Sequence, residues 1–276
     1  MTVGAGDRGR LGTPGNDRSP NRTLEKGLQL LNLFDVEHPE WSLRELRETS
    51  GFSKTTTLRL VKTLEAMEYL ACDPNTGRYY LGSSMLRHAY VGLSRSELAR
   101  TAHPFMDQLA KETTETAGLT VWTNQGPLLV DLVLTARMFK PNLRLGMLLP
   151  GRGGAAERVH LAFGRESARE AILSGPQKAR TAYTLVDPKL LREELQRVRR
   201  EGVSFELREW DVSMGAVAAP VFGADGLIRA VLAVVVPIER CGEEEMAAYK
   251  QSVRRTAHAL SQEIGYQGDP PGSPLN

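Results

Sequence analysis

The chain has 276 residues, of which 41% are hydrophobic and 25% are charged, a composition typical of soluble globular proteins and long enough for two domains. Its formal net charge of +2 is too small to indicate a polyanionic partner, so any nucleic-acid surface must be a local patch. Cys72 and Cys241 are far apart and lack metal-ligand spacing, so the sequence indicates neither a zinc site nor a disulfide framework.

The first part of the chain predicts three helices. Residues 1–20 are rich in Gly, Pro, Asp and Arg without periodicity, so we expect a disordered tail before them. Apolar residues at helical spacing indicate the first helix. Ser42 and Glu45 form a capping box that opens the second, and Gly51 ends it. Ser53 caps the third almost at once, and this arrangement is typical of a helix-turn-helix.

A strand, a turn and a second strand follow the third helix. Residues 70–72 and 78–82 have strand composition, and the residues between them, 73–77, form a turn sequence with Pro, Asn and Gly. Such a hairpin would be a wing. Residues 21–82 are therefore predicted to be a winged helix-turn-helix domain.

The next segment is helical and joins the two domains. Met85–Ala117 has a helical pattern, with expected breaks at residues 92–96 and at Pro104. We expect residues 83–100 to be a linker helix and the remainder to enter the second domain.

Residues 101–266 alternate short apolar segments with helical ones. The expected strands are 119–123, 128–134, 143–148, 203–207, 215–222 and 227–236. The expected helices are 155–164, 166–173, 188–200 and 243–265. This pattern predicts an α+β domain around a mainly antiparallel sheet.

Neither export nor membrane insertion is expected. The longest apolar run, Ala230–Ile238, is too short to cross a bilayer, and the N-terminus lacks the apolar segment of a signal peptide. Residues 267–276 are rich in proline and are expected to form a second disordered tail. We therefore expect a cytoplasmic protein with no membrane partner.

The start of the third helix carries a basic, hydroxyl-bearing face and has no acidic residue before Glu65. Leu58, Val61 and Leu64 are predicted to pack on the opposite side. In a helix-turn-helix this segment enters the major groove, where Arg reads guanine and Thr contacts bases or phosphates. The alternative is an ordinary solvated helix face. The candidate DNA-binding residues are Ser53, Lys54, Thr55, Thr56, Thr57, Arg59 and Lys62.

Two arginines outside this helix are further candidates. Arg22 precedes the first helix and Arg78 lies on the predicted wing, so both could hold phosphates or enter a minor groove. Isolated surface arginines are also common without any such role.

The sequence gives little support for catalysis. His103, His160 and His258 have no metal-ligand partner at helical spacing, and no nucleophile, metalloprotease or phosphate-loop motif is present. No cofactor is predicted. The stretch Pro150–Gly154 feeds a helix beginning at Ala155, so it is either an anion site or a simple connector.

Several motifs together resemble the isocitrate lyase regulator (IclR) family of bacterial transcription regulators. They are Phe52–Leu60, Arg78–Gly82, Gly202–Phe205, Met214–Phe222, Pro237 and Ile264–Tyr266, in order across residues 21–266. The resemblance implies a DNA-binding winged helix-turn-helix, a GAF-like effector-binding domain, homodimers or homotetramers, and a palindromic operator.

The resemblance also implies where an effector binds. In the family the effector lies between a loop-to-helix segment and nearby strands, which maps to Leu149, Ala155, Ala156, Glu206, Ala216, Ala233 and Val235. Members that bind small keto acids carry polar groups at the last three positions, and this chain has apolar ones. We therefore hypothesise an aromatic carboxylate whose anion meets the amides of the two alanines at 155 and 156. Trp122 and Met147 would add to the lining, unless they and Val235 are plain sheet core.

These observations predict a ligand-responsive repressor of a catabolic operon that binds double-stranded operator DNA. One alternative is an enzyme that processes a small acid and carries an autoregulatory DNA-binding head, for which Glu206 is the only candidate group. Another is a structural DNA-binding protein without any ligand.

Overall fold

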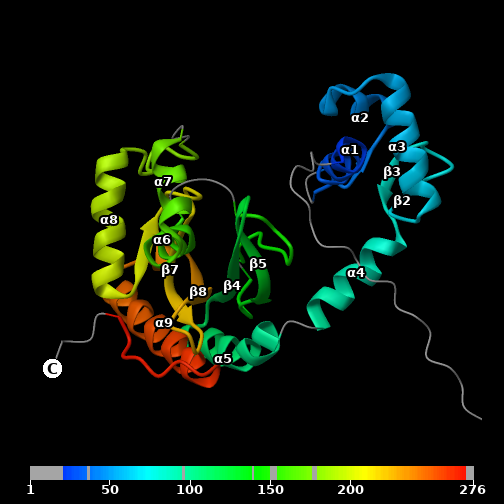
Figure 1. Ribbon diagram of the computed structural model, residues 1–276. Helices are drawn as coiled ribbons and strands as arrows, with labels where there is room; N and C mark the ends of the chain where they lie inside the picture. Colours follow the sequence, from blue (N-terminus) through cyan, green and yellow to red (C-terminus); the bar gives the residue numbers. More distant parts are fainter. Residues whose placement is uncertain are drawn as a thin grey trace, which may run out of the picture. The chain divides into compact units, whose positions relative to one another are not determined.

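The computed structural model describes residues 21–35, 38–94, 97–138, 140–149, 154–175 and 179–271. The contacts divide the chain between Gly92 and Leu93 into two compact units (Figure 1). The expected tails over 1–20 and 272–276 lie outside the described residues. Residues 267–271 differ from the expected tail, because the Arg254 guanidinium donates a hydrogen bond to the Pro271 carbonyl at 3.0 Å.

The N-terminal unit contains three helices and a small antiparallel sheet. The helices are α1 (Arg22–Leu31), α2 (Leu43–Ser50) and α3 (Lys54–Ala66). The sheet has the order β1-β3-β2, with β1 (Glu40–Trp41), β2 (Leu70–Cys72) and β3 (Tyr79–Leu81). Leu30, Leu46 and Val61 are fully buried in the shared core. The predicted helix-turn-helix and wing hairpin are therefore confirmed, and β1 is an addition.

Local sequence fixes the ends of α2 and α3. The Ser42 hydroxyl accepts from the Glu45 amide while the Glu45 carboxylate accepts from the Ser42 amide. Gly51 ends α2 at φ +70°, in the left-handed region that glycine adopts at little cost. The Ser53 hydroxyl then accepts from the Thr56 amide and starts α3. The sharp turn between the two helices follows from these caps.

Two helices lead from the first unit into the second: α4 (Ser83–Ser94) and α5 (Glu97–Thr113). Residues 95 and 96, part of the expected break at 92–96, lie outside the described residues. The predicted break at Pro104 is wrong, because α5 continues through it. Ala102 and Met106 on either side are fully buried in the core, and this packing outweighs the one helical hydrogen bond that proline cannot make.

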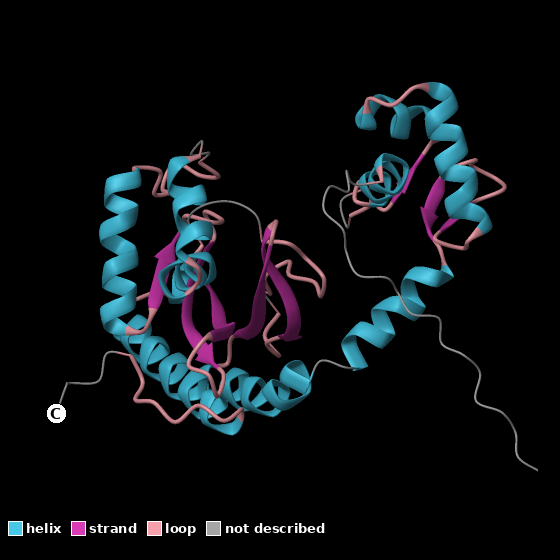
Figure 2. Ribbon diagram, viewed as in Figure 1, coloured by secondary structure: helices cyan, strands magenta, loops and turns pink. Residues whose placement is uncertain are grey.

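The C-terminal unit is a five-stranded antiparallel sheet between two helical layers (Figure 2). The strand order is β5-β4-β8-β7-β6, with β4 (Thr116–Thr123), β5 (Gly126–Val133), β6 (Ser204–Leu207), β7 (Met214–Phe222) and β8 (Ile228–Pro237). The helices are α6 (Ala155–Phe163), α7 (Glu166–Ser174), α8 (Pro188–Glu201), the 3-10 turn η1 (Ile238–Arg240) and α9 (Glu243–Glu263). The predicted α+β class is confirmed. In the described part of the chain, no helix has the length and apolarity needed to cross a membrane.

The central strands β7 and β8 are buried on both faces. Val217 and Val234 pack with α5 and α9, whereas Ala218 and Ala233 pack with α6 and α8. Successive side chains of a strand point to opposite faces, so each strand serves both layers. The expected strand at 143–148 does not form, and that segment makes only an isolated bridge between Leu128 and Leu148.

Candidate DNA interface and ligand pocket

The N-terminal half of α3 presents exposed polar side chains that no described part of the protein contacts through a hydrogen bond or an ion pair. Lys54, Thr55 and Arg59 are exposed, and none of their side chains has a hydrogen-bond or ion-pair partner among the described residues. Free cationic and hydroxyl groups at the start of a recognition helix are suited to phosphates and base edges.

The helix α1 contributes to the same surface. A depression between α1 and α3 is lined by Arg22, Thr23, Lys26, Thr55, Thr56, Arg59, Leu60 and Thr63. Arg22, predicted from the sequence, thus lies beside the recognition helix. Lys26 was not predicted, although it follows Arg22 by one helical turn and so shares its face. The candidate interface carries positive charge from two helices.

Three of the predicted residues also interact within α3. The hydroxyls of Ser53 and Thr56 lie 2.9 Å apart, and Lys62 forms an ion pair with Glu65 at 2.7 Å. Ser53 and Lys62 are exposed. A partner would therefore meet side chains whose positions are already restricted.

Thr57 does not belong to this surface. Its side chain is fully buried and donates to the Ser53 carbonyl at 3.1 Å, whereas Leu58 is 39% exposed. The buried side of α3 is formed by Thr57, Leu60 and Val61. The predicted packing of Val61 and Leu64 is confirmed, whereas that of Leu58 is wrong, because the contacts of Leu60 and Val61 with the core turn Thr57 inward in its place.

Arg78 is also placed differently from the prediction. Its guanidinium pairs with the Glu45 carboxylate at 2.9 Å and donates to the Glu40 carbonyl at 3.2 Å. Arg78 therefore ties β3 to β1 and α2. We remove it and Thr57 from the set of candidate DNA contacts.

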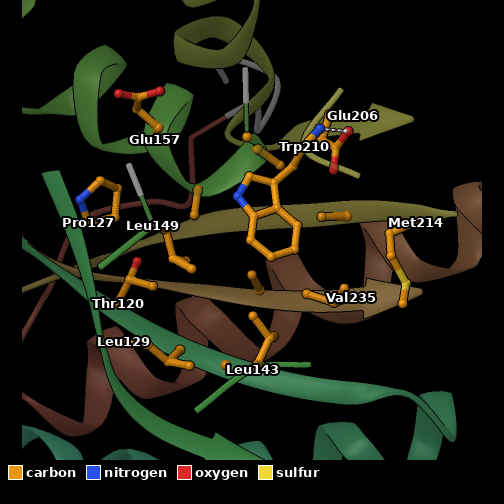
Figure 3. Close-up of a pocket in the computed structure, with 16 residues that line it drawn as sticks. Thr120, Pro127, Leu129, Leu143, Leu149, Glu157, Glu206, Trp210, Met214 and Val235 are labelled. Carbon is orange, nitrogen blue, oxygen red and sulfur yellow. Dashed lines mark hydrogen bonds between the residues drawn. The ribbon is translucent and has the colours of Figure 1, made fainter. Parts of the chain in front are cut away.

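The C-terminal unit holds a cavity between the sheet and the N-terminus of α6 (Figure 3). Including its open mouth, the space measures about 670 Å³. Seven residues predicted for the effector line it: Leu149, Ala155, Ala156, Glu206, Ala216, Ala233 and Val235. Strand register explains this convergence, because Ala216 faces Val235 across β7 and β8, and Gly118 of β4 faces Ala233.

Two other predicted residues lie outside the cavity lining. Trp122 packs against His160, with ring centroids 5.6 Å apart, in a separate surface depression. Met147 contacts β5 through its backbone, because its carbonyl accepts a hydrogen bond from the Leu129 amide at 2.9 Å. For Trp122 the sheet-core alternative is the better description, since it packs against the α6 layer.

The lining also includes residues that were not predicted from the sequence as effector contacts. They are Gly118, Thr120, Pro127, Leu129, Leu143, Gly154, Glu157, Trp210 and Met214. Trp210 had a detectable signal, because it is an aromatic residue within the charged loop sequence Arg208–Asp211. The other lining residues belong to strands and loops that are distant in the sequence and come together only in the folded protein.

The first turn of α6 offers free amides to the cavity. No side chain caps the helix at Gly154, and the amides of Ala155 and Ala156 have no acceptor among the described residues. A helix N-terminus carries partial positive charge and favours anions. Residues 151–153 of the glycine-rich stretch lie outside the described residues.

Glu206 is the titratable group best placed to respond near neutral pH. Burial raises the pKa of its carboxyl to about 7, although the amides of Glu209 and Trp210 donate to one of its oxygens at 2.8 and 3.4 Å. Figure 3 shows this carboxyl beside Trp210 at one end of the cavity. Its charge therefore changes within the physiological pH range.

His160 is uncharged at neutral pH. Burial lowers its pKa to about 3, and its Nε2 lies 3.0 Å from the Thr120 hydroxyl, which lines the cavity. Over the described residues, no three His, Cys, Asp or Glu side chains are grouped so that they could hold a metal ion.

Two family models match the chain. The model of the bacterial transcriptional regulator IclR C-terminal region matches residues 90–262, and that of the IclR helix-turn-helix domain matches residues 23–74. The first match alone covers more than half of the chain.

Similar proteins extend these matches over both units. The HTH-type transcriptional regulator XynR of Escherichia coli K12 is 24% identical over 246 residues, covering 89% of this chain and 98% of XynR. A structure from Silicibacter sp. TM1040, assigned as an IclR transcriptional regulator, is 26% identical with a TM-score of 0.81, covering 92% and 100%. An IclR homologue from Microbacterium hydrocarbonoxydans, complexed with 4-hydroxybenzoate, is 20% identical with a TM-score of 0.75, covering 88% and 98%. The matches are regulators rather than enzymes, which contradicts the alternative of an acid-processing enzyme.

Proposed function

Because this chain belongs to the IclR family of bacterial transcriptional regulators, and is thus a ligand-responsive DNA-binding regulator, we propose that it represses a catabolic operon and is released by an aromatic carboxylate. As a bacterial DNA-binding protein it would act in the cytoplasm. The observation that carries the effector class is the combination, in one cavity, of an apolar lining with two free helix amides.

The cavity chemistry supports an aromatic acid over a compact polar one. Ala216, Ala233 and Val235 offer a ligand no hydrogen bond, so each unpaired oxygen of a small keto acid would cost about 1–3 kcal/mol. An aromatic ring would pack against these three apolar side chains. The carboxylate of the same ligand would accept hydrogen bonds from the amides at the start of α6. The Microbacterium homologue, complexed with 4-hydroxybenzoate, is an instance of an aromatic acid bound by a protein of this fold.

Calorimetric titration tests this effector class. We expect binding of at least one of benzoate, 4-hydroxybenzoate and phenylacetate, and no binding of pyruvate or glyoxylate. The bound acid should also lower affinity for DNA flanking the gene. Binding of the keto acids alone would contradict the proposal, and a DNA affinity that no ligand changes would favour a structural DNA-binding protein.

The affinity for an anionic effector should depend on pH through Glu206. Its carboxyl ionises as the pH rises through about 7 and then repels the ligand carboxylate, so we expect the dissociation constant to increase between pH 6 and pH 8. The expected change is about fivefold, as for two like charges in a partly solvated site. Glu206→Gln cannot ionise and should bind equally at both pH values, whereas the exposed-site control Glu170→Gln should keep the wild-type dependence.

The protein should act as a homodimer on a two-fold symmetric operator. Leu24 and Leu28 on α1, and Leu86 and Tyr90 on α4, are each more than half exposed. A second copy of the chain would cover these apolar side chains. Sedimentation equilibrium should therefore give a dimer or a tetramer, and Tyr90→Asp should shift the population towards monomers. A wild-type monomer at micromolar concentration would contradict this.

A further inference from the structure

Trp210 brings to the cavity a polar group that the protein leaves without a partner. Its indole Nε1 is buried and has no hydrogen-bond partner in the part of the chain that the structure describes. Figure 3 shows the indole ring lying across the cavity, with the nitrogen on the side of Leu149 and Pro127. An indole N–H only donates, so the vacant partner must be an acceptor.

The loop that carries Trp210 is held from several sides. The Glu209 carboxylate accepts from the buried guanidinium of Arg158 on α6 at 2.5 Å, and its carbonyl accepts from the Thr184 hydroxyl at 2.7 Å. The Arg180 guanidinium lies 4.9 Å from the Trp210 ring centroid and donates to the Trp210 carbonyl. These contacts leave the indole little freedom to seek an acceptor elsewhere.

A buried donor without an acceptor is destabilising, and such groups in native proteins mark sites where a ligand or solvent supplies the missing partner. Ala155 and Ala156 line the same cavity, and among the described residues their amides also lack acceptors. Three unpaired donors around one apolar space favour a ligand that brings several acceptor atoms, as a carboxylate does.

We propose that Trp210 is a specificity-determining residue that donates its indole N–H to an oxygen of the effector's acid group. Together with the α6 amides, it forms the acid-recognising end of the pocket. The proposal rests on the function proposed above, because it assumes an effector that carries an acid. It also links the β6–β7 loop to α6 through a shared ligand.

The test uses the full-length protein and Trp210→Phe, which keeps one aromatic ring and removes the N–H donor together with the second ring of the indole. The probe is the tightest-binding acid among benzoate, 4-hydroxybenzoate and phenylacetate, titrated by calorimetry. We expect at least about tenfold weaker binding by the variant, the usual effect of losing a hydrogen bond to a charged group. Trp122→Phe is the matched control, since Trp122 lies outside the cavity lining, and it should bind like the wild type.

Nuclear magnetic resonance of the wild-type protein provides a second measurement that does not depend on a variant folding. The three tryptophans give three indole N–H signals, which the two Trp→Phe variants and Trp41→Phe assign. Addition of the probe should move the Trp210 signal downfield and leave that of Trp41, already bonded to the Leu33 carbonyl, unchanged.

The outcomes separate the two proposals. If no acid in the panel binds the wild type, the effector class is wrong and the role of Trp210 falls with it. If an acid binds the wild type and Trp210→Phe equally, or binds without moving the Trp210 signal, only the role of Trp210 is wrong.

Discussion

Replacing Thr56 and Arg59 together with alanine should weaken operator binding by about 100-fold, since a base-reading arginine alone is worth about 1–3 kcal/mol. Both residues line the depression between α1 and α3, and the Arg59 guanidinium has no partner among the described residues. The measurement is fluorescence anisotropy on an operator defined by footprinting the DNA that flanks the gene, at a fixed salt concentration.

A matched control separates this effect from loss of charge. Arg44 on α2 has a side chain that is 80% exposed, and its one ion-pair partner among the described residues is its helical neighbour Glu48. Arg44→Ala removes the same charge from the same unit. It should change operator affinity less than about threefold, because a surface arginine that contacts neither phosphates nor bases contributes little to DNA binding. If the double variant folds and binds the operator like the wild type, α3 is not the recognition helix.

Replacing Glu209 with glutamine should lower the free energy of unfolding by about 3 kcal/mol, because it leaves the Arg158 guanidinium buried without its counter-charge. Arg158 is 3% exposed, and its Glu209 contact is 2.5 Å. The estimate takes the low end of the usual range, since Glu194 remains 3.7 Å from the guanidinium. Urea unfolding followed by tryptophan fluorescence and circular dichroism measures the change.

Glu170→Gln is the control for Glu209→Gln. Glu170 pairs with Arg192 at 3.4 Å, but both side chains are about half exposed, so the same substitution should cost less than about 1 kcal/mol. Equal losses in the two variants would mean that the Arg158–Glu209 contact is no stronger than a surface pair. In that case the β6–β7 loop would owe its position to the threonine contacts instead.

Sequence reasoning succeeded where a structure is decided by neighbours along the chain. The capping box of Ser42 and Glu45, the left-handed Gly51 and the cap at Ser53 are all local, and together they define the helix-turn-helix. Short continuous apolar runs likewise identified β7 and β8, because both faces of each strand are buried.

It failed where distant contacts decide. Pro104 remains inside α5 because the flanking residues are buried, and residues 143–148 form a loop although their composition suits a strand. Thr57 and Leu58 exchange their expected exposure because the core sets the rotation of α3. No periodicity in the sequence contains this information.

The residues of the ligand pocket also fall into those that could be predicted and those that could not. Ala216, Ala233 and Val235 were placed by resemblance to a family with a known arrangement, and the structure brings them to one cavity. Trp210 has no such guide, because its position depends on partners in α6 and in the segment before α8. From the sequence alone, Trp210 could be noted only as an aromatic residue in a charged loop, without a place in the pocket.

The double burial of β7 and β8 has a consequence for how such a regulator evolves. Ala216 and Ala218 lie on the face that holds the cavity, whereas Val217 and Ala219, which alternate with them, pack with α5 and α9. New inducer preferences can therefore arise by exchanging every second residue of a strand. The intervening positions pack against α5, the helix that leads towards the DNA-binding unit. They can keep their residues while the ligand specificity of the cavity changes.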